Sequence, residues 1–511
     1  MKSTNAMNIR AASLGLFAML PFAGPVLAQE LPQLRVAFPE DADIMDPTTG
    51  RAYVQRVALL NMCDSLFTYD SKLQIVPRLA LSYEWADSRT LVVKLRPGVT
   101  FHDGTPVDAA AVKYSLERHA TYPGSARRGD VGSLERTEVV DPLTVRFILK
   151  TADVVFLSQL GVRGGMLVSP RAAEAAGKDF GLNPICAGPY KFTERVAQDR
   201  IVIDRVPGYW DAANYHFSRV IFRPITDGTV RLANLRAGSV DINMNVPAIE
   251  VDTVRRDPKL KMYSFDGLGY TGITVNMGRA GSTPGPFGTD ARVRRAFDLA
   301  LDREAIVNVV FAGVHAPNAQ PVPPSSPFYV ASIAQPKRDV ARARALLAEA
   351  GVKTPFPIQL TVINNPENIQ VAEVMQSMLA EAGFELKLNT MEFVSSLDAA
   401  DKGNFTAYMV GWTGRPDVDG NLRDLLYTGA GTNYVGYKNP AFDTLLDQGR
   451  SLGDMASRMA SYTKIFQSLR EDLPIIYLYS PRWNFGTVAK VEGFEPVADG
   501  MLRLNGVKFA R

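Results

Sequence analysis

Hydrophobic positions along this chain follow two periods, which alternate after about residue 30. Short runs that are apolar, or apolar at every second position, predict strands, whereas longer runs with apolar positions three and four residues apart predict helices. The predicted strands are 34–38, 90–95, 143–149, 191–195, 200–206, 220–225, 270–277, 358–363, 384–391, 407–412 and 475–480. The predicted helices are 52–66, 108–119, 227–237, 290–301, 302–312, 339–350, 366–382, 440–450 and 454–469.

The order of these elements predicts an α/β fold with more than one core. Asp108, Asp227 and Asp290 each stand where a helix pattern begins, and an aspartate there can accept hydrogen bonds from the free N–H groups of the first turn. After residue 270, strands and helices alternate at a spacing that predicts a crossover unit between parallel strands. The last strand, 475–480, is expected to return the chain to the first half of the fold. A length of 511 residues implies two to three packed units.

The stretch 407–421 combines a buried strand with a charged loop. Its first six residues are apolar, which is typical of a strand buried on both faces. Glycines and a proline then force a loop that carries Arg415, Asp417 and Asp419. Open α/β sheets bind ligands at such strand ends, and one cation with two anions can meet both ends of a zwitterion. The alternative is an ordinary solvated turn, in which glycine and aspartate have their usual conformational roles.

The first 28 residues have the pattern of a secretory signal peptide. Lys2 and Arg10 form a weakly basic start, 11–23 is an apolar segment, and Val26-Leu27-Ala28 has small residues where signal peptidase reads them. We therefore predict cleavage before Gln29 and an exported, periplasmic protein that is soluble after the cleavage. The alternative of an N-terminal anchor is disfavoured because the apolar run is short for a bilayer span.

Composition excludes one class of partner and leaves the state of the cysteines open. The chain is 46% hydrophobic and 21% charged, with a net charge of +3 and no basic cluster, so nothing supports a nucleic acid as a partner. Cys63 and Cys186 are the two cysteines. An exported protein can join them in a disulfide. Because the sequence does not give their separation, two buried free thiols are the favoured expectation.

No enzyme motif emerges from the sequence, and we expect no cofactor and no metal. The four histidines have no metal-binding spacing, and no C-x-x-C, G-x-S-x-G or phosphate-binding loop is present. His102 next to Asp103 is the most enzyme-like position, although a hydrogen-bonded turn histidine explains it better. Asp417 and Asp419 form only a weak candidate for an acid–base pair. A secreted hydrolase acting on peptides or conjugates remains the alternative to a binding protein.

Ten motifs in a fixed order give the chain a family resemblance. It resembles the extracellular solute-binding proteins of family 5, the peptide, nickel and opine receptors of ABC importers. The stretches that carry the resemblance are A-L-L-N-M-C-D-S-L-F-T-Y-D near residue 60, I-V-P-R-L-A at Ile75, L-R-P-G-V-T-F-H-D-G-T-P-V-D-A-A-A-V-K-Y-S-L-E-R from Leu95, A-G-P-Y-K-F at Ala187, P-G-Y-W at Pro207, R-L-A-N-L-R-A-G-S-V-D-I from Arg231, D-A-R-V-R-R-A-F-D-L-A-L-D-R from Asp290, A-R-A-L-L-A-E-A-G at Ala343, G-W-T-G at Gly411 and E-D-L-P-I-I at Glu471.

The resemblance implies a two-lobed α/β periplasmic binding protein of the Venus-flytrap type, with an extra N-terminal subdomain. The first lobe would comprise 29–266 plus 481–511, with the subdomain at about 76–183, and the second lobe would be 267–480. The chain would cross between the lobes near 266–269 and near Ser480, and the lobes would close over the ligand. Such a protein is expected to be a monomer that delivers its small-molecule ligand to an ABC permease in the inner membrane.

The resemblance also implies where the ligand binds. Peptide-binding relatives carry an acid shortly after the Gly-Trp step, where it pairs with the amino terminus of the peptide. This chain has Arg415 there, which suits a carboxylate, while Asp417 or Asp419 could take an amine. Trp412 would form an apolar wall. A zwitterionic peptide or opine-like conjugate is therefore expected, and nickel is disfavoured. Further candidate positions around the cleft are Asp46, Tyr190, Tyr270 and Asn433.

Overall fold

The computed structural model describes residues 1, 3 and 31–510. The predicted cleavage site before Gln29, and nearly all of the predicted export signal, lie outside these described residues. The chain from Pro32 onward forms one compact unit. Within the described residues, no helix has both the length and the apolar character needed to cross a bilayer.

A mixed seven-stranded sheet forms the centre of the first lobe. β1 is the predicted strand at the start of the fold, and it pairs in parallel with β10 and β11 because the chain returns to it twice. Leu34, Val36 and Phe38 of β1 are buried and pack in one large core with residues of the other strands. The order across the sheet is β12 (Leu260–Asp266), β19 (Arg482–Val488), β11 (Ile242–Asn243), β1 (Gln33–Phe38), β10 (Arg219–Pro224), β9 (Arg200–Arg205) and β8 (Tyr190–Val196).

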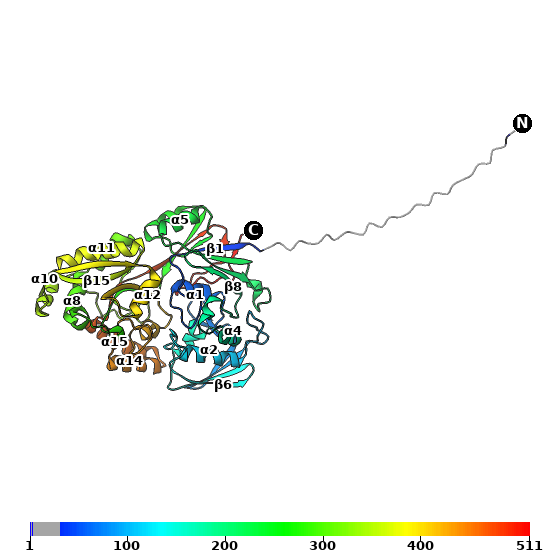
Figure 1. The fold of residues 1–511 in the computed structure, drawn as a ribbon, viewed down its shortest axis with the longest axis horizontal. Helices are drawn as coiled ribbons and strands as arrows, with labels where there is room; N and C mark the ends of the chain where they lie inside the picture. The colour runs from blue at the N-terminus through cyan, green and yellow to red at the C-terminus, as the bar shows by residue number, and fades with distance from the viewer. Residues whose placement is uncertain (2, 4–30, 511) are drawn as a thin grey trace. The chain divides into compact units, whose positions relative to one another are not determined.

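A six-stranded sheet forms the centre of the second lobe. The predicted crossover is present, since β15 pairs in parallel with β16 through the helix α11 (Pro366–Glu381), and β15 also pairs in parallel with β17. Figure 1 shows α8 (Ala291–Ala300), α10 (Val340–Glu349) and α11 gathered beside β15. The order is β14 (Ala316–Pro317), β18 (Ile475–Ser480), β13 (Tyr270–Val275), β17 (Ala407–Trp412), β15 (Phe356–Ile363) and β16 (Phe384–Met391).

The chain passes between the two large sheets twice in the described residues, once between β12 and β13 and once between β18 and β19. The two passages are hydrogen-bonded to each other, because Gly267 N donates to Pro481 O at 3.2 Å. The prediction that strand 475–480 returns to the first half of the fold was wrong. This strand, β18, is buried throughout and pairs with β13 in the second sheet, and the next strand, β19, is the one that returns.

A smaller antiparallel sheet lies between β1 and β8 in the sequence and has its own core. Its strands are β4 (Ala80–Asp87), β5 (Thr90–Leu95), β7 (Thr144–Leu149) and β6 (Leu134–Asp141), in this order. The helix α2 (Ala109–Thr121) packs against it, with Val112 and Leu116 buried. Two short pairs complete the sheets: β2 (Phe67–Tyr69) with β3 (Ile75–Pro77), and β20 (Val491–Glu492) with β21 (Lys508–Phe509).

The helices begin where the sequence predicts their caps. The side chains of Asp108, Asp227 and Asp290 accept hydrogen bonds from first-turn N–H groups. The helix predicted over 52–66 ends early, at Leu60, because the Asn61 side chain bonds to the carbonyl of Val57. The remaining helices are α1 (Tyr53–Leu60), α3 (Phe156–Gln159), α4 (Pro170–Ala176), α5 (Gly228–Arg236), α6 (Val251–Arg256), α7 (Pro286–Thr289), α9 (Arg303–Phe311), α12 (Phe393–Asp401), α13 (Arg423–Leu426), α14 (Pro440–Ser451) and α15 (Met455–Asp472).

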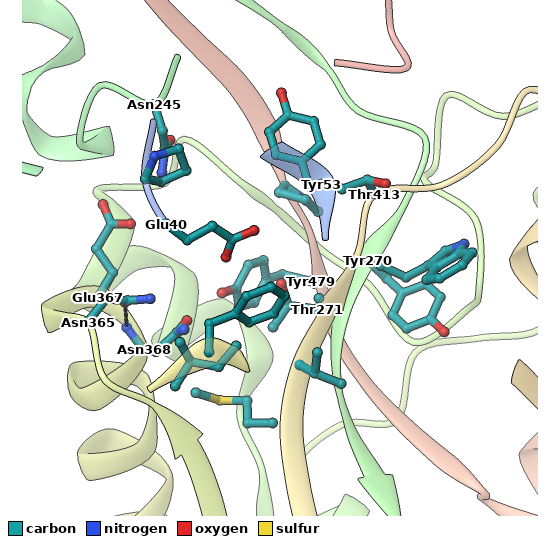
Figure 2. A pocket seen from close by; sticks show the side chains of 18 of the residues that line it. Glu40, Tyr53, Asn245, Tyr270, Thr271, Asn365, Glu367, Asn368, Thr413 and Tyr479 are labelled. Carbon is teal, nitrogen blue, oxygen red and sulfur yellow. Dashed lines mark hydrogen bonds between the residues drawn. The ribbon is translucent and has the colours of Figure 1, made fainter. Parts of the chain in front are cut away.

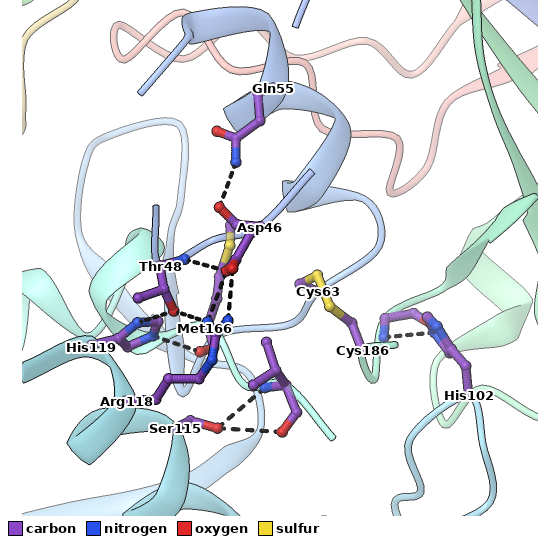
Figure 3. The surroundings of a disulfide bond; sticks show 12 residues. Asp46, Thr48, Gln55, Cys63, His102, Ser115, Arg118, His119, Met166 and Cys186 are labelled. Atoms are coloured by element: carbon purple, nitrogen blue, oxygen red, sulfur yellow. Dashed lines mark hydrogen bonds and ion pairs between the residues drawn. A yellow bond between two sulfur atoms is a disulfide. The ribbon is translucent and has the colours of Figure 1, made fainter. Parts of the chain in front are cut away.

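Cys63 and Cys186 form a disulfide, so the expectation of two free thiols was wrong (Figure 3). Their Cα atoms are 4.8 Å apart although 123 positions separate them in the sequence. Gly188 permits this approach, since a Cβ atom there would lie 2.4 Å from the backbone carbonyl carbon of Met62. The disulfide therefore fastens the chain entering the small antiparallel sheet to the chain leaving it.

Candidate functional site

A cavity of about 300 Å³ is lined by residues of both lobes. The first lobe contributes segments that follow β1 and β11, the helix α1 and the start of β19. From the second lobe come the ends of β13 and β17, the start of α11 and the loop before α14. The segments between β12 and β13, and between β18 and β19, are where the chain passes from one sheet to the other. The cavity is therefore a cleft between the lobes.

An aromatic pair forms part of the first-lobe wall. Tyr53 of α1 and Trp483 of β19 stack with their ring centroids 4.9 Å apart, and both line the cavity. Tyr53 donates a hydrogen bond to the carbonyl of Gly500, and Trp483 donates one to the carbonyl of Ala498. Because their polar atoms are engaged by the backbone, these rings offer the cleft an apolar face.

The loop after β17 places Trp412 and Arg415 on the second-lobe wall. The central carbon of the Arg415 guanidinium lies 4.5 Å from the centre of the Trp412 ring, a cation–π arrangement. Asn421 fixes the loop: its side-chain oxygen accepts from Arg415 N at 2.8 Å, and its amide donates to Leu268 O at 2.9 Å. Leu268 lies in the crossing segment, the passage of the chain between β12 and β13. Gly414 lets the loop approach this segment, because Gly414 has φ +82° and a Cβ atom on it would lie 2.4 Å from the Leu268 backbone.

Arg415 is buried without a carboxylate partner. Only 5% of the residue is exposed, and its Nη1 donates to the carbonyl of Gly414 at 2.9 Å. Among the ion pairs found in the described residues, none involves Arg415. Burial, and then the positive charge of Arg56, lower the pKa of Arg415 to about 9. The guanidinium thus lines the cleft without a direct carboxylate partner among the described residues.

The two aspartates of the same loop point elsewhere. Asp417 forms a two-pronged ion pair with Arg458 of α15, with Nη–Oδ distances of 2.8 and 2.9 Å. Asp419 is fully buried and accepts from Arg450 Nε at 2.8 Å and from Arg423 Nε at 3.3 Å. Burial raises the pKa of Asp419, but these two guanidiniums outweigh burial and hold it below its usual value. Neither aspartate lines the cavity, and both bond to arginines other than Arg415.

The other predicted positions divide between the cleft and the cores. Tyr270 lines the cavity and packs edge-on against Tyr477, with ring centroids 4.6 Å apart. Asn433 stands behind the wall, where its amide donates to the carbonyls of Tyr427 and Tyr437 at 3.1 and 2.9 Å. It bonds to the backbone on both sides of Tyr434, which does line the cavity.

Asp46 and Tyr190 belong to the interior of the first lobe. Asp46 forms a two-pronged ion pair with Arg118 of α2, with distances of 2.9 and 2.7 Å (Figure 3). Tyr190 is fully buried and lies edge-on to Tyr215. His102, the most enzyme-like position in the sequence, makes its ring contact with the backbone of Gly188 at 3.1 Å. None of the three lines the cavity.

An acidic part of the cleft was not predicted. Glu40 lies two residues after the end of β1, and Glu367 lies in the first turn of α11; both line the cavity (Figure 2). Burial, and then Asp43 and Glu392, raise the pKa of Glu40 to about 8. Burial likewise raises the pKa of Glu367. The signal that could have found Glu40 is its place at the end of a predicted strand, the same rule that selected the loop after β17.

No metal-binding group emerges from the geometry. Within the described part of the chain, no three histidine, cysteine, aspartate or glutamate side chains come together as a cation site. The chemistry that the cleft offers is charge recognition, with carboxyl groups of Glu40 and Glu367 and the Arg415 guanidinium on its walls beside aromatic surfaces.

Comparison with known proteins agrees with this architecture. The chain is 28% identical over 468 residues to the glutathione-binding protein GsiB of Pectobacterium atrosepticum, covering 89% of this chain and 90% of that one. It is 30% identical over 384 residues to GsiB of Salmonella paratyphi A, covering 75% and 73%. The fold matches the agropinic acid complex of AgaA from A. tumefaciens R10 with a TM-score of 0.84 at 26% identity, covering 94% of this chain and 99% of that one.

A further solved structure extends the likeness of the fold. The periplasmic binding protein DppA of Helicobacter pylori, in complex with the peptide STSA, matches with a TM-score of 0.86 at 24% identity, covering 94% of this chain and 99% of that one. The family profile of bacterial extracellular solute-binding proteins, family 5 (Middle), matches residues 74–434. The chain therefore belongs to the bacterial extracellular solute-binding proteins of family 5.

Proposed function

We propose that this protein captures a small zwitterionic solute, a peptide or an opine-like amino-acid conjugate, in the cleft between its lobes. It works in the periplasm as a monomer without catalytic activity, and it delivers the solute to the ABC permease of the inner membrane. Family membership supports the transport role, and the relatives named for glutathione, peptide and agropinic acid binding support this class of ligand. The hydrolase considered from the sequence has no support in these comparisons.

The observation that carries the proposal is that the cleft holds both a buried guanidinium and carboxyl groups. Arg415 is buried on the second-lobe wall with no ion pair among the described residues, while Glu40 lies on the first-lobe wall. A guanidinium stacked on Trp412 keeps its planar donors for a carboxylate. Glu40 and Glu367 suit an amine. A zwitterion therefore satisfies both sides of the cleft, and it holds the two lobes together while it is bound.

The movement that loads the cleft follows from the two chain passages. We assign 29–266 with 481–511 to the first lobe, including the subdomain at about 76–183, and 267–480 to the second. The hydrogen bond between Gly267 and Pro481 joins the passages, which would act as the hinge. Arg51, which lines the cleft from the first lobe, pairs with Asp401 of α12, and this contact must break when the lobes open.

Replacing Arg415 with alanine is expected to weaken ligand binding by roughly thirtyfold or more, because it removes one partner of a desolvated, hydrogen-bonded charge pair. Calorimetric titration with a dipeptide, glutathione and an opine measures the effect. Arg136→Ala is the matched control, since Arg136 is an exposed arginine of the small sheet and its loss should leave affinity unchanged. If Arg415→Ala binds within about threefold of the parent, the proposed role of Arg415 is wrong.

Ligand binding is also expected to depend on pH through Glu40. Its folded pKa of about 8 lies above the ordinary value of 4.5, so Glu40 is mostly neutral in the empty cleft near pH 7. A bound ammonium group requires the carboxylate, so binding releases a proton. Affinity should rise by up to about tenfold per pH unit below the folded pKa, and it should fall again where the amino group of the ligand loses its own proton, at about pH 8 for an α-amino group.

Two comparisons test this dependence. Titrations in buffers with different ionisation enthalpies count the protons that are released. Glu40→Gln keeps the size of the side chain but cannot ionise, so its affinity should be lower and nearly independent of pH over the same range. The acids Asp43 and Glu392 and the cation Arg231 act on Glu40 in the folded protein and remain in this variant. A pH profile that is the same in the variant and the parent would refute the role of Glu40.

A further inference from the structure

Among the described residues, five arginines line the cleft, and three of them, from separate segments, are buried. Arg56 comes from α1, Arg163 from the short 3-10 helix η1 (Arg163–Gly165), and Arg415 from the loop after β17. Their exposed fractions are 4%, 3% and 5%, so all three guanidinium-bearing side chains are buried. We call these three residues the arginine cluster. Because only the fold brings these residues together, no local sequence motif predicts the cluster.

The members of the cluster are close enough to act on one another's charge. Burial, and then the positive charges of Arg127, Arg415 and Arg56, lower the pKa of Arg163. The pKa of Arg415 is lowered by burial and then by Arg56. Arg56 has its pKa lowered by burial as well. The empty cleft thus holds several cations that repel each other in a medium of reduced polarity.

The hydrogen-bond acceptors that Arg56 and Arg163 contact are neutral groups of the protein. Arg56 donates to the Met501 sulfur at 2.9 Å and to the Asp499 carbonyl at 3.1 Å. Arg163 donates to the Gly50 carbonyl at 3.0 Å and to the Gln55 side chain at 2.8 Å. In the described residues no ion pair involves a member of the cluster, and Arg163 Nε is buried without any acceptor.

The carboxyl groups near the arginine cluster either pair with other arginines or have a raised pKa. Asp130 pairs with Arg127 at 3.0 Å, and Asp499 pairs with Arg503 at 2.8 Å. Asp424 is buried, and burial followed by the charge of Asp130 raises its pKa to about 6. These carboxylates therefore offset part of the positive charge around the cluster without binding its guanidinium groups.

A buried cation without a carboxylate destabilises a fold, so a cluster of three calls for neutralisation from outside the chain. One carboxylate can bridge two guanidiniums, as Asp419 does with Arg450 and Arg423. A third guanidinium, from the other lobe, exceeds this number and leaves room for a second anionic group. Accepting the proposed function, we propose that the cleft selects a ligand with two anionic groups, namely two carboxylates in addition to its amine. The favoured ligand is then a net anion, and the ordinary neutral dipeptide is the poorer one.

Matched pairs of probes test this selection by calorimetric titration. Alanyl-glutamate and glutathione carry two carboxylates each, whereas alanyl-glutamine and glutathione monoethyl ester carry one each. The unmodified protein should bind the dicarboxylates roughly tenfold or more tightly than their partners. Arg163→Gln and Arg56→Gln should each lose most of this preference while binding of the monocarboxylates changes by less than about threefold. Arg136→Gln, at an exposed site, should keep the full preference.

The folded state of the variants supplies a second measurement. Removing a charge from the cluster relieves repulsion, so Arg56→Gln should melt at the same temperature as the ligand-free parent or higher, although it loses hydrogen bonds. If Arg163→Gln fails to fold, Arg56→Gln and the unmodified protein still report the preference. A structural role alone would lower the melting temperature and leave the preference unchanged, which would overturn the inference.

The outcomes separate this inference from the function on which it rests. Equal binding of dicarboxylates and monocarboxylates would overturn the selection and leave the zwitterion-binding function standing. A preference that survives in both cluster variants would also overturn it, because the selection would then arise elsewhere in the cleft. Failure of every probe to bind at millimolar concentration would refute both.

Discussion

Replacing Cys63 and Cys186 with alanine is expected to lower the free energy of unfolding by about 5 kcal/mol. The disulfide closes a loop with a sequence separation of 123 residues, and removing the cross-link restores the conformational freedom of that long segment to the unfolded chain. The loop contains the whole small antiparallel sheet, so this sheet and its junction with the first lobe should lose stability first. Urea unfolding of the double variant measures the difference.

Reduction provides an internal control for this prediction. The unmodified protein treated with a reductant should unfold at the same urea concentration as the double variant, and the reductant should leave the variant unaffected. Ligand binding at low urea should be retained, because Cys63 and Cys186 are outside the lining of the cleft. A loss below about 1 kcal/mol would contradict the prediction and would mean that the reduced chain keeps the two segments together.

Replacing Asp419 with alanine is expected to cost about 3–5 kcal/mol of stability. Asp419 is fully buried between Arg450 and Arg423, and its removal leaves two cations in the interior without this carboxylate. Arg450 also pairs with Asp153 at 3.2 Å, so it keeps one acidic partner from the segment before α3. Denaturant unfolding followed by circular dichroism provides the measurement.

Asp447→Ala is the matched control for this substitution. Asp447 pairs with the same Arg423, at 2.8 Å, but its side chain is 56% exposed, so its loss should cost only about 0–1 kcal/mol. The folded Asp419→Ala protein should bind ligand within about threefold of the parent, because Asp419 is outside the lining of the cleft. If Asp419→Ala instead abolishes binding and keeps full stability, the residue contacts the ligand and its structural assignment is wrong.

The charged side chains of the loop after β17 have two different roles. Arg415 turns toward the cleft, whereas Asp417 and Asp419 turn toward α15 and α14 and hold the loop against the second lobe. Asn421 ties the same loop to the crossing segment at Leu268. The position of Arg415 is therefore set by contacts of its loop within the second lobe and with Leu268.

The sequence by itself determined the elements and the fold class. β16 and β17 have the bounds that the sequence predicts, and the aspartate caps at Asp108, Asp227 and Asp290 are present. These features depend on neighbours within a few residues, so their pattern can be read along the chain. The ten ordered motifs indicated the family, and its profile matches residues 74–434. The rule that ligands gather at strand ends selected the loop after β17, whose Trp412 and Arg415 line the cleft.

Only the tertiary structure decided which charges are neutralised and which face the cleft. Asp417 meets Arg458 across 41 positions of sequence, and Cys63 meets Cys186 across 123. Strand 475–480 joins the second sheet because it pairs with β13, a partner about 200 positions earlier, and its apolar pattern suits either sheet equally. The arginine cluster draws on three distant segments. Charges act over space and not along the chain, so their partners are fixed by packing, which the order of residues does not display.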